Sequence, residues 1–219
     1  QIHIFRHKVV YKSLELWYYN YMVRFKTYLE EAAGKGLTIF DIDETMFKTK
    51  ARVHVVKDGK VIKKLDNQEF NDYKLKKGED FDFGEFTNAK IFNQTSTPIA
   101  RMINKVKSIL KNATKKGSKV IIVTARPNFD DRELFLDTFR NQGIDIDKIY
   151  VERAGNLGKG PAAENKKVIF KKYLEQNIYK RMRLFDDAKE NLKAFLSFQD
   201  EYPGISFEAF LAKPNGSVS

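Results

Sequence analysis

Five short apolar runs alternate with stretches of helical periodicity, and this alternation restricts the fold more than any other feature of the chain. The runs are LTIFDID (37–43), KVIIVTA (119–125), DKIYVE (147–152), RMRLFDD (181–187) and ISFEAFLA (205–212). KVIIVTA is β-branched and almost continuous, as expected for a strand that is buried on both faces. Strands that alternate with helices favour right-handed crossovers and parallel pairing. The sequence therefore predicts an α/β domain with a mostly parallel, five-stranded central sheet.

Helical patterns fill the segments between these runs. They cover residues 98–116, 130–141, 162–174 and 189–198. The first of them has apolar residues at helical spacing, with Thr97 at the position of an N-cap and Gly117 just past its end. In sheets of this kind, ligands bind beyond the carboxyl ends of the strands. Polar residues that end a strand are therefore candidates for a functional site.

The two ends of the chain lie outside the alternating pattern. Residues 8–33 are predicted to form a long helix with one apolar stripe, so residues 1–36 are interpreted as an N-terminal helical extension. The stripe is expected to pack against the domain, or else to dock a protein partner or a second copy of the chain. Residues 213–219, KPNGSVS, are expected to be a flexible tail.

An insertion interrupts the main domain, which we assign to residues 37–212. Residues of about 48–96 are predicted to form a small cap beside the first strand. Within it, residues 51–65 have the pattern of a hairpin that turns at Asp58 and Gly59. Residues 66–96 are predicted to be irregular and are rich in aromatic side chains.

The composition restricts the classes of binding partner and the cellular compartment that we expect. The 219 residues include 40 Lys and Arg against 29 Asp and Glu, which leaves a net charge of +11. Such a surplus attracts nucleic acid or phosphorylated substrates, although lysines spread along the chain equally fit a solubilising surface. The absence of cysteine excludes disulfides and thiolate metal sites and fits a reducing compartment. No run reaches the roughly 18 apolar residues of a membrane span, so we expect a cytoplasmic protein without membrane contact.

Carboxylates and a hydroxyl end three of the predicted strands. Asp41 and Asp43 end the first, Thr124 ends the second, and Asp186 with Asp187 ends the fourth. Burying carboxylates at the end of an apolar strand costs several kcal/mol unless a partner compensates the charge. A divalent cation held by oxygen ligands, together with a lysine, would supply that compensation.

Four motifs together resemble the haloacid dehalogenase (HAD) superfamily over roughly residues 37–212. DIDET (41–45) is similar to the family's DxDx[T/V] motif, VTAR (123–126) to its second motif and LFDDAKEN (184–191) to its acidic fourth motif. A lysine near the start of the helix at 162–174 would be the third motif. The resemblance implies a Rossmann-like HAD domain, a phosphorylated substrate and Mg²⁺ as the cofactor.

The resemblance also implies a role for each matching aspartate. Asp41 would attack phosphorus and form an aspartyl-phosphate, and Asp43 would protonate the leaving oxygen and then activate water. Dehalogenase members lack the second aspartate, so its presence favours a phosphatase. Asp187 would bind the metal directly, with Asp186 as the supporting carboxylate. Asp41 and the backbone carbonyl of Asp43 would be further ligands.

Thr124 would donate a hydrogen bond to a phosphoryl oxygen, and a lysine would neutralise the charge that develops there. We assign this lysine to Lys166, because apolar residues follow it at the spacing of an inward-facing helical stripe. Lys167 is the second candidate, since the ends of predicted helices are uncertain by a few residues.

Thr45 and Arg126 are the candidate substrate-binding residues. Arg126 lies two residues after the motif threonine and could bind a second phosphate of the substrate. Alternatively, it could start a helix and pair with Asp130 or Asp131. Glu44 departs from the glycine that often precedes the threonine in this family, which could alter the turn after the first strand.

The small cap and the basic charge favour a large phosphorylated substrate over a small one, because only a large cap encloses a small substrate. We therefore expect a nucleic-acid terminal phosphate or a nucleotide, as in the phosphatase modules of polynucleotide-repair enzymes, which this arrangement resembles. The stretch EFTNAKIFNQTSTPI (85–99) resembles HAD proteins of tailed bacteriophages, which would imply a host cytoplasm. The alternatives are a phosphatase of a small metabolite such as a sugar phosphate, and a HAD-fold binding or structural protein docked through helix 8–33.

Overall fold

The computed structural model describes residues 34–115, 117–158 and 160–219, so the predicted helix at 8–33 lies outside the described residues. Its central sheet has the strand order β10-β9-β1-β7-β8, and every neighbouring pair is parallel. The strands are β1 (Lys35–Phe40), β7 (Lys119–Thr124), β8 (Tyr150–Arg153), β9 (Tyr179–Asp186) and β10 (Ser206–Leu211). This confirms the predicted Rossmann-like α/β class with a five-stranded parallel sheet.

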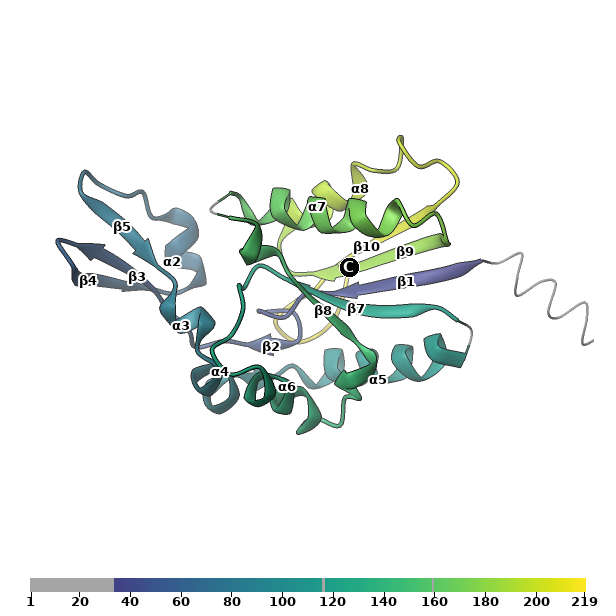
Figure 1. Ribbon diagram of the computed structural model, residues 1–219, viewed down its shortest axis with the longest axis horizontal. Helices are drawn as coiled ribbons and strands as arrows, with labels where there is room; N and C mark the ends of the chain where they lie inside the picture. The colour runs from purple at the N-terminus through teal and green to yellow at the C-terminus, as the bar shows by residue number, and fades with distance from the viewer. Residues whose placement is uncertain (1–33, 116, 159) are drawn as a thin grey trace, which may run out of the picture.

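Helices cover both faces of the sheet (Figure 1). They are α5 (Ala100–Lys115), α6 (Arg132–Arg140), α7 (Ala162–Leu174) and α8 (Lys189–Leu196). Strand β7 explains why both faces must be covered, because its apolar side chains alternate between the two hydrophobic cores. Ile122 lies in the core beneath α5 and α6, whereas Ile121 and Val123 lie in the core beneath α7 and α8.

Several element boundaries differ from the sequence prediction by one or a few residues, and the starts of β8 and α5 have a clear physical reason. The third run does not begin as a strand at 147, because a 3₁₀ turn (Ile146–Lys148) precedes β8 and buries Ile146 and Ile149 on the same side. Thr97 is not an N-cap. It forms the short strand β6 (Thr97–Pro98), which pairs with β2 (Phe47–Lys48), and α5 begins only at Ala100. A residue that precedes proline is biased toward extended backbone, and this bias won over the helical pattern.

The cap contains a three-stranded antiparallel sheet, which we call the cap sheet, with the order β4-β3-β5. Its elements are β3 (Val53–Lys57), β4 (Lys60–Leu65), α2 (Asn67–Asp72) and β5 (Glu79–Asp82), followed by α3 (Gly84–Thr87). The predicted hairpin is confirmed, and Asp58 and Gly59 both have positive φ at its turn, at 49° and 73°.

The prediction that residues 66–96 are irregular is wrong. Helix α2 begins with a capping box in which Asp66 and Glu69 accept each other's backbone N–H groups. Phe70 and Phe81 then pack against the small core of the cap, formed by Val53, Val55 and Leu65. The aromatic residues of this segment are therefore largely accounted for by packing. Helix α4 (Ala89–Thr95) lies within the range predicted for the cap but packs on α6 and buries Phe92 in the main core.

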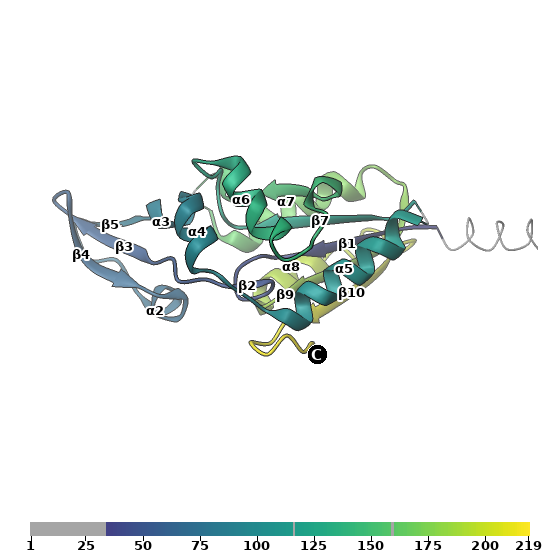
Figure 2. The same cartoon turned by 90° about the horizontal axis from the view of Figure 1, so that it is seen from below.

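The cap sheet stands beyond the end of the central sheet toward which β1 runs, and it extends away from the main domain in both views (Figures 1 and 2). The carboxyl ends of the parallel strands therefore face the cap. From β1, the chain adds β7 and β8 on one side and β9 and β10 on the other, so the winding of the sheet reverses at β1. Such a reversal is where open α/β sheets bind ligands.

The last residues correct the prediction of a flexible tail at 213–219. They turn back along β10, where Leu211 and Ser219 exchange two backbone hydrogen bonds and Ala212 forms an isolated antiparallel bridge with Val218. Val218 packs against the main core, and Gly216, at φ 77°, lies so close to Ile99 and Arg101 that a Cβ atom would collide with them. The apolar contact of Val218 provides the physical reason for the order.

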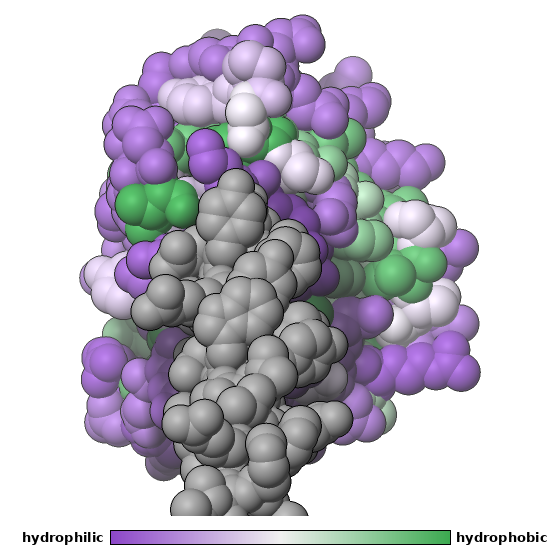
Figure 3. All heavy atoms as spheres, turned by 90° about the vertical axis from the view of Figure 1, so that its right-hand side faces the viewer, coloured by the Kyte–Doolittle hydropathy of each residue, from purple (hydrophilic) through white to green (hydrophobic). Residues whose placement is uncertain are grey.

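The visible part of the face opposite the cap is largely hydrophilic, and its hydrophobic residues form separate patches (Figure 3). Among the described residues, no helix is long and apolar enough to cross a membrane.

Candidate active site

Asp41, Lys166 and Asp186 form a buried ionic cluster at the carboxyl end of β1. The Nζ atom of Lys166 lies 2.7 Å from Oδ1 of Asp41 and 2.8 Å from Oδ2 of Asp186. The three residues are only 5%, 1% and 0% exposed. The register explains the meeting of the two aspartates, because Phe40 pairs with Phe185 and each aspartate follows directly. Helix α7 supplies the lysine.

The other candidate lysine is directed elsewhere. Lys167 lies with its Nζ atom 5.5 Å from the ring centre of Phe198. Because successive helical residues point about 100° apart, only one of the two lysines can reach the sheet edge. The structure brings Lys166 to this edge.

Asp186 has both carboxylate oxygens occupied. Oδ2 accepts from Lys166, whereas Oδ1 accepts from the backbone N–H of Ala188 at 2.9 Å and from Nδ2 of Asn191 at 2.8 Å. Asp186 therefore holds the lysine in place and fixes the turn into α8. Sequence reasoning missed Asn191, although its place at the start of the helix after the two aspartates was an available signal.

Asp187 is the carboxylate of this group that is open to solvent. It is partly exposed, and its Oδ1 accepts a 3.3 Å hydrogen bond from Oγ1 of the buried Thr45. Ligand atoms of Asp41, Asp186 and Asp187 lie within 4.8 Å of one another. Burial and the nearby Asp186 raise the pKa of Asp187 to about 7, and burial raises the pKa of Asp41 well above its ordinary value.

These carboxylates fit a divalent cation. Three carboxylates share one lysine, so the ionised cluster carries an excess of negative charge in a buried place. Burial alone would lower the pKa of Lys166, but Asp186 and Asp41 outweigh it and raise that pKa, so the lysine stays charged. A hard cation with oxygen ligands would remove the remaining excess, with Asp187 and Asp41 as its side-chain ligands. The roles of Asp187 as direct ligand and Asp186 as supporting carboxylate stay predictions.

Asp43 is held by Arg126. Nη2 of Arg126 donates to Oδ1 of Asp43 at 2.7 Å, and Nε donates to Oδ2 at 2.8 Å. The same guanidinium donates to the carbonyl of Phe86 at 3.1 Å and to Oγ1 of Thr49 at 2.8 Å. It also lies 4.9 Å from the ring centre of Phe92. Arg126 is 2% exposed. Its hydrogen bonds to Asp43 and to Phe86 connect the first motif to the cap.

The predicted alternative for Arg126, a pair with Asp130 or Asp131, is wrong. Asp131 is the N-cap of α6, where it accepts from the N–H of Leu134, and Asp130 accepts from the N–H of Ala89. Both aspartates at the start of α6 therefore accept hydrogen bonds from backbone N–H groups, and Arg126 pairs with Asp43 instead.

Thr124 is fully buried at the end of β7, and its Oγ1 accepts a 3.1 Å hydrogen bond from the N–H of Arg126. Among the described residues the hydroxyl donates no hydrogen bond, so its proton can be given to another acceptor. The turn after β1 holds Glu44 at φ 54°, a left-handed conformation that favours glycine. Its carboxylate accepts from the N–H of Thr49, which helps to hold a side chain at this position.

We predict that Arg126→Lys lowers the free energy of unfolding by about 2–3 kcal/mol, because a lysine cannot reach Asp43, Phe86 and Thr49 together. Urea denaturation measures this change. Arg132→Lys is the matched control, since Arg132 is exposed and pairs with its neighbour Glu133. Equal losses in both variants would contradict the structural role of Arg126.

No protein-family model matches this chain, and no curated protein matches it. Among solved structures, the HAD domain of effector protein Lem4 from Legionella pneumophila is similar, with 13% sequence identity and a TM-score of 0.49. The match covers 84% of this chain and 88% of that chain.

Proposed function

We propose that this chain is a HAD-type phosphatase that hydrolyses phosphate monoesters with the help of Mg²⁺, through an aspartyl-phosphate on Asp41. The observation that carries this proposal is the convergence of Asp41, Lys166 and Asp187 at one edge of the sheet, beside Asp43 and Thr124. Phosphoryl transfer requires charge neutralisation around an in-line attack, and these residues offer a nucleophile, cations and a proton carrier.

In the first step, a carboxylate oxygen of Asp41 attacks phosphorus and the bond to the leaving oxygen breaks. Asp43 gives its proton to that oxygen. Burial raises the pKa of Asp41, and Lys166, which contacts Asp41 directly, acts in the opposite direction and so favours the ionised nucleophile. In the second step, Asp43 takes a proton from water, the water oxygen attacks phosphorus, and the bond to Asp41 breaks. Phosphate leaves and both aspartates return to their starting states.

The contacts of Asp43 are compatible with this proton transfer. When Asp43 carries its proton, one O–H is available to donate, and the remaining lone pairs of its two oxygens can still accept from Arg126. Arg126 therefore orients Asp43 without closing it to a proton. Thr124 would donate its free hydroxyl proton to a phosphoryl oxygen. A bound Mg²⁺ would polarise the phosphoryl group and offset the repulsion between the two anions.

We further propose a nucleic-acid terminal phosphate or a nucleotide as the substrate. The net charge of +11 and a cap sheet that extends away from the main domain support a large anionic substrate. The second candidate is a small phosphorylated metabolite, which the same catalytic residues would accept. A binding protein docked through residues 8–33 is the third, and it does not account for the charge cluster at the sheet edge.

The test is phosphate release from p-nitrophenyl phosphate and from a 3′-phosphorylated oligonucleotide, with Mg²⁺ or with a chelator. We expect turnover only with the metal, and a higher kcat/KM for the oligonucleotide that falls as salt increases. Equal kcat/KM for both substrates would favour the small-metabolite alternative. No phosphate release from folded, metal-loaded protein on these substrates or on a panel of phosphorylated metabolites would contradict the phosphatase assignment.

We also predict that millimolar Mg²⁺ raises the thermal unfolding midpoint by about 2–8 °C at pH 8. The gain should be smaller at pH 6, because the pKa of Asp187 is raised to about 7 and protons then compete with the metal. Calorimetry with and without chelator measures both values. Asp187→Asn should remove most of the gain, whereas Glu190→Gln, at an exposed carboxylate three residues away, should keep it.

A further inference from the structure

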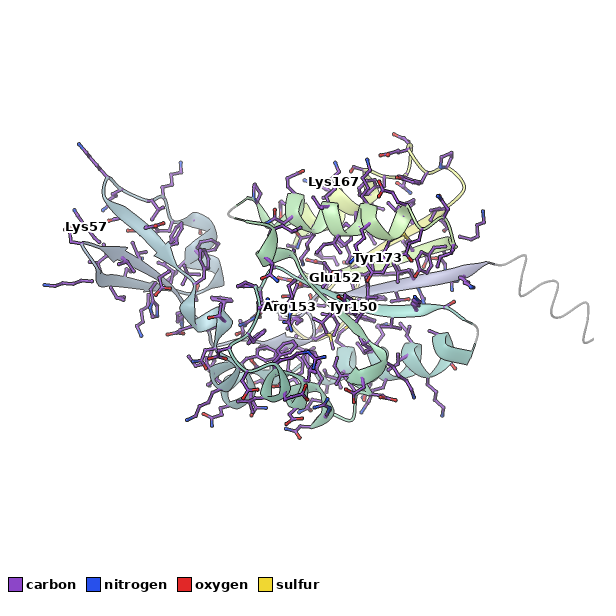
Figure 4. The ribbon with its side chains drawn as sticks, in the orientation of Figure 1. Lys57, Tyr150, Glu152, Arg153, Lys167 and Tyr173 are labelled. Carbon is purple, nitrogen blue, oxygen red and sulfur yellow. The ribbon has the colours of Figure 1, made fainter. Side chains whose placement is uncertain are left out.

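Arg153 lies at the same edge of the sheet as the proposed catalytic residues. It is the last residue of β8 and pairs in register with Thr124, the last residue of β7. Adjacent strands lie about 4.8 Å apart, so Arg153 is one strand away from the hydroxyl proposed to bind the phosphoryl group. Figure 4 labels Arg153 and Tyr150 on β8, and Arg153 lies nearer to the cap.

One nitrogen of the Arg153 guanidinium lacks a hydrogen-bond acceptor among the described residues. That nitrogen is Nη1, which is buried. Two aromatic rings pack against the group, with centres 5.2 Å (Phe129) and 4.3 Å (Phe135) from its central carbon. Aromatic rings stabilise a cation but accept no strong hydrogen bond, so the donor atom still lacks a partner.

Two neighbouring arginines differ from Arg153 because each of them pairs with a carboxylate. Arg126 lies 5.5 Å from the ring centre of the same Phe129 but pairs with Asp43, and Arg132 pairs with Glu133. Burial lowers the pKa of Arg153 to about 10, and the charges of Arg132 and Arg126 act in the same direction. The group is still protonated at neutral pH. Arg153 therefore carries a charge that an anion would satisfy, and the residue as a whole is partly exposed although its Nη1 atom is buried.

We propose that Arg153 forms an anion subsite for a second phosphate of the substrate, next to the terminal phosphate that Asp41 attacks. This inference rests on the proposed function and specifies its substrate class, a phosphate monoester with a further phosphate or phosphodiester nearby. A guanidinium suits this ligand, because two parallel N–H donors match two phosphate oxygens. A nucleoside 3′,5′-bisphosphate and a 3′-phosphorylated dinucleotide both have this chemistry.

The kinetic test compares these two compounds with p-nitrophenyl phosphate, which has no second anion. In Arg153→Met, which keeps apolar bulk over the two rings, the ratio of kcat/KM for the bisphosphate to kcat/KM for the aryl phosphate should fall about 10- to 100-fold. Arg153→Lys keeps the charge but loses the two parallel N–H donors, so the same ratio should fall by less than in Arg153→Met. If the dinucleotide ratio falls and the bisphosphate ratio does not, the subsite binds a phosphodiester, and the reverse result assigns it to a free phosphate.

Two results would overturn the subsite. One is an unchanged ratio for both compounds in Arg153→Met, which would leave Arg153 as a residue that only packs on its aromatic neighbours. The other is an equal fall in Arg132→Met, which would show a general charge effect. Arg132 is the matched control because it lies in the same electrostatic neighbourhood with a carboxylate partner.

A binding measurement separates this inference from the catalytic proposal. Calorimetric titration of the nucleoside 3′,5′-bisphosphate into the Asp41→Asn protein, and into Asp41→Asn with Arg153→Met, requires no turnover. A loss of affinity of about 10-fold or more on the second substitution supports the subsite even if wild type releases no phosphate from any substrate. Equal affinities contradict the subsite even if the enzyme is an active phosphatase.

Discussion

Asp41→Asn should reduce kcat/KM for phosphate release by about 10⁴-fold or more, because an amide cannot attack phosphorus and no aspartyl-phosphate can form. The variant should still fold. Within the described residues, the side chain of Asp41 makes one hydrogen bond, which it accepts from Lys166, and that lysine keeps Asp186 as its partner. Steady-state kinetics with p-nitrophenyl phosphate measures the loss, and circular dichroism checks the fold.

The matched control is Asp145→Asn. Asp145 is exposed, and within the described part of the chain its ion pair is a surface contact with Lys148. It lies before the start of β8 and thus at the other end of the strands. Its activity should stay within about twofold of wild type, as expected for a surface substitution. If Asp41→Asn retained a tenth of the wild-type rate while folded, the assignment of Asp41 as nucleophile would be wrong.

Lys166→Met should produce the largest loss of stability. The lysine is fully buried between Asp41 and Asp186, and its removal leaves buried carboxylates without their cation. Breaking a buried ion pair from one side costs about 3–5 kcal/mol. Urea denaturation at pH 8 with a chelator present should show this loss. Lys167→Met should cost less than about 1 kcal/mol, since the ammonium of Lys167 lies 5.5 Å from the ring centre of Phe198 and has no carboxylate partner among the described residues.

The loss in Lys166→Met should depend on pH. Burial raises the pKa of Asp187 to about 7 and also raises the pKa of Asp41, and removing Lys166 takes away a charge that lowers both. A carboxyl whose pKa is higher in the folded state is destabilising when ionised, so stability falls as pH rises through this range. The loss should therefore be greatest at pH 8 and smaller at pH 5. Lys166→Met with Asp186→Asn should recover part of it, and a loss that ignores pH would contradict the ionic explanation.

Local sequence patterns predicted the regular part of the fold well. The parallel sheet followed from β-branched runs such as 119–125, whose burial on both faces needs helices on either side. The cap hairpin followed from Asp58 and Gly59, which take the positive φ values that the turn requires. In both places the local preference of the residues agrees with the tertiary structure.

Prediction failed where a distant contact changed the local preference. The strand β5 carries two aspartates and a glutamate in four residues and forms only because it pairs with β3. Residues 213–219 read as a polar tail, yet Val218 fits against the main core and fixes them. Neither the pairing of β5 with β3 nor the packing of Val218 has a periodic signal in the sequence.

The sequence by itself determined the chemistry available to this protein. Carboxylates and a threonine end strands that must be parallel, so they had to meet at one edge, and a lysine followed on a helix. Only the tertiary structure decided the partners. It brought Lys166 and not Lys167 to the aspartates and paired Asp43 with Arg126, 83 residues away. It also left Nη1 of Arg153 without a partner among the described residues. The physical reason is that hydrogen bonds and ion pairs depend on ångström-scale distances between residues far apart in the chain, which no local pattern encodes.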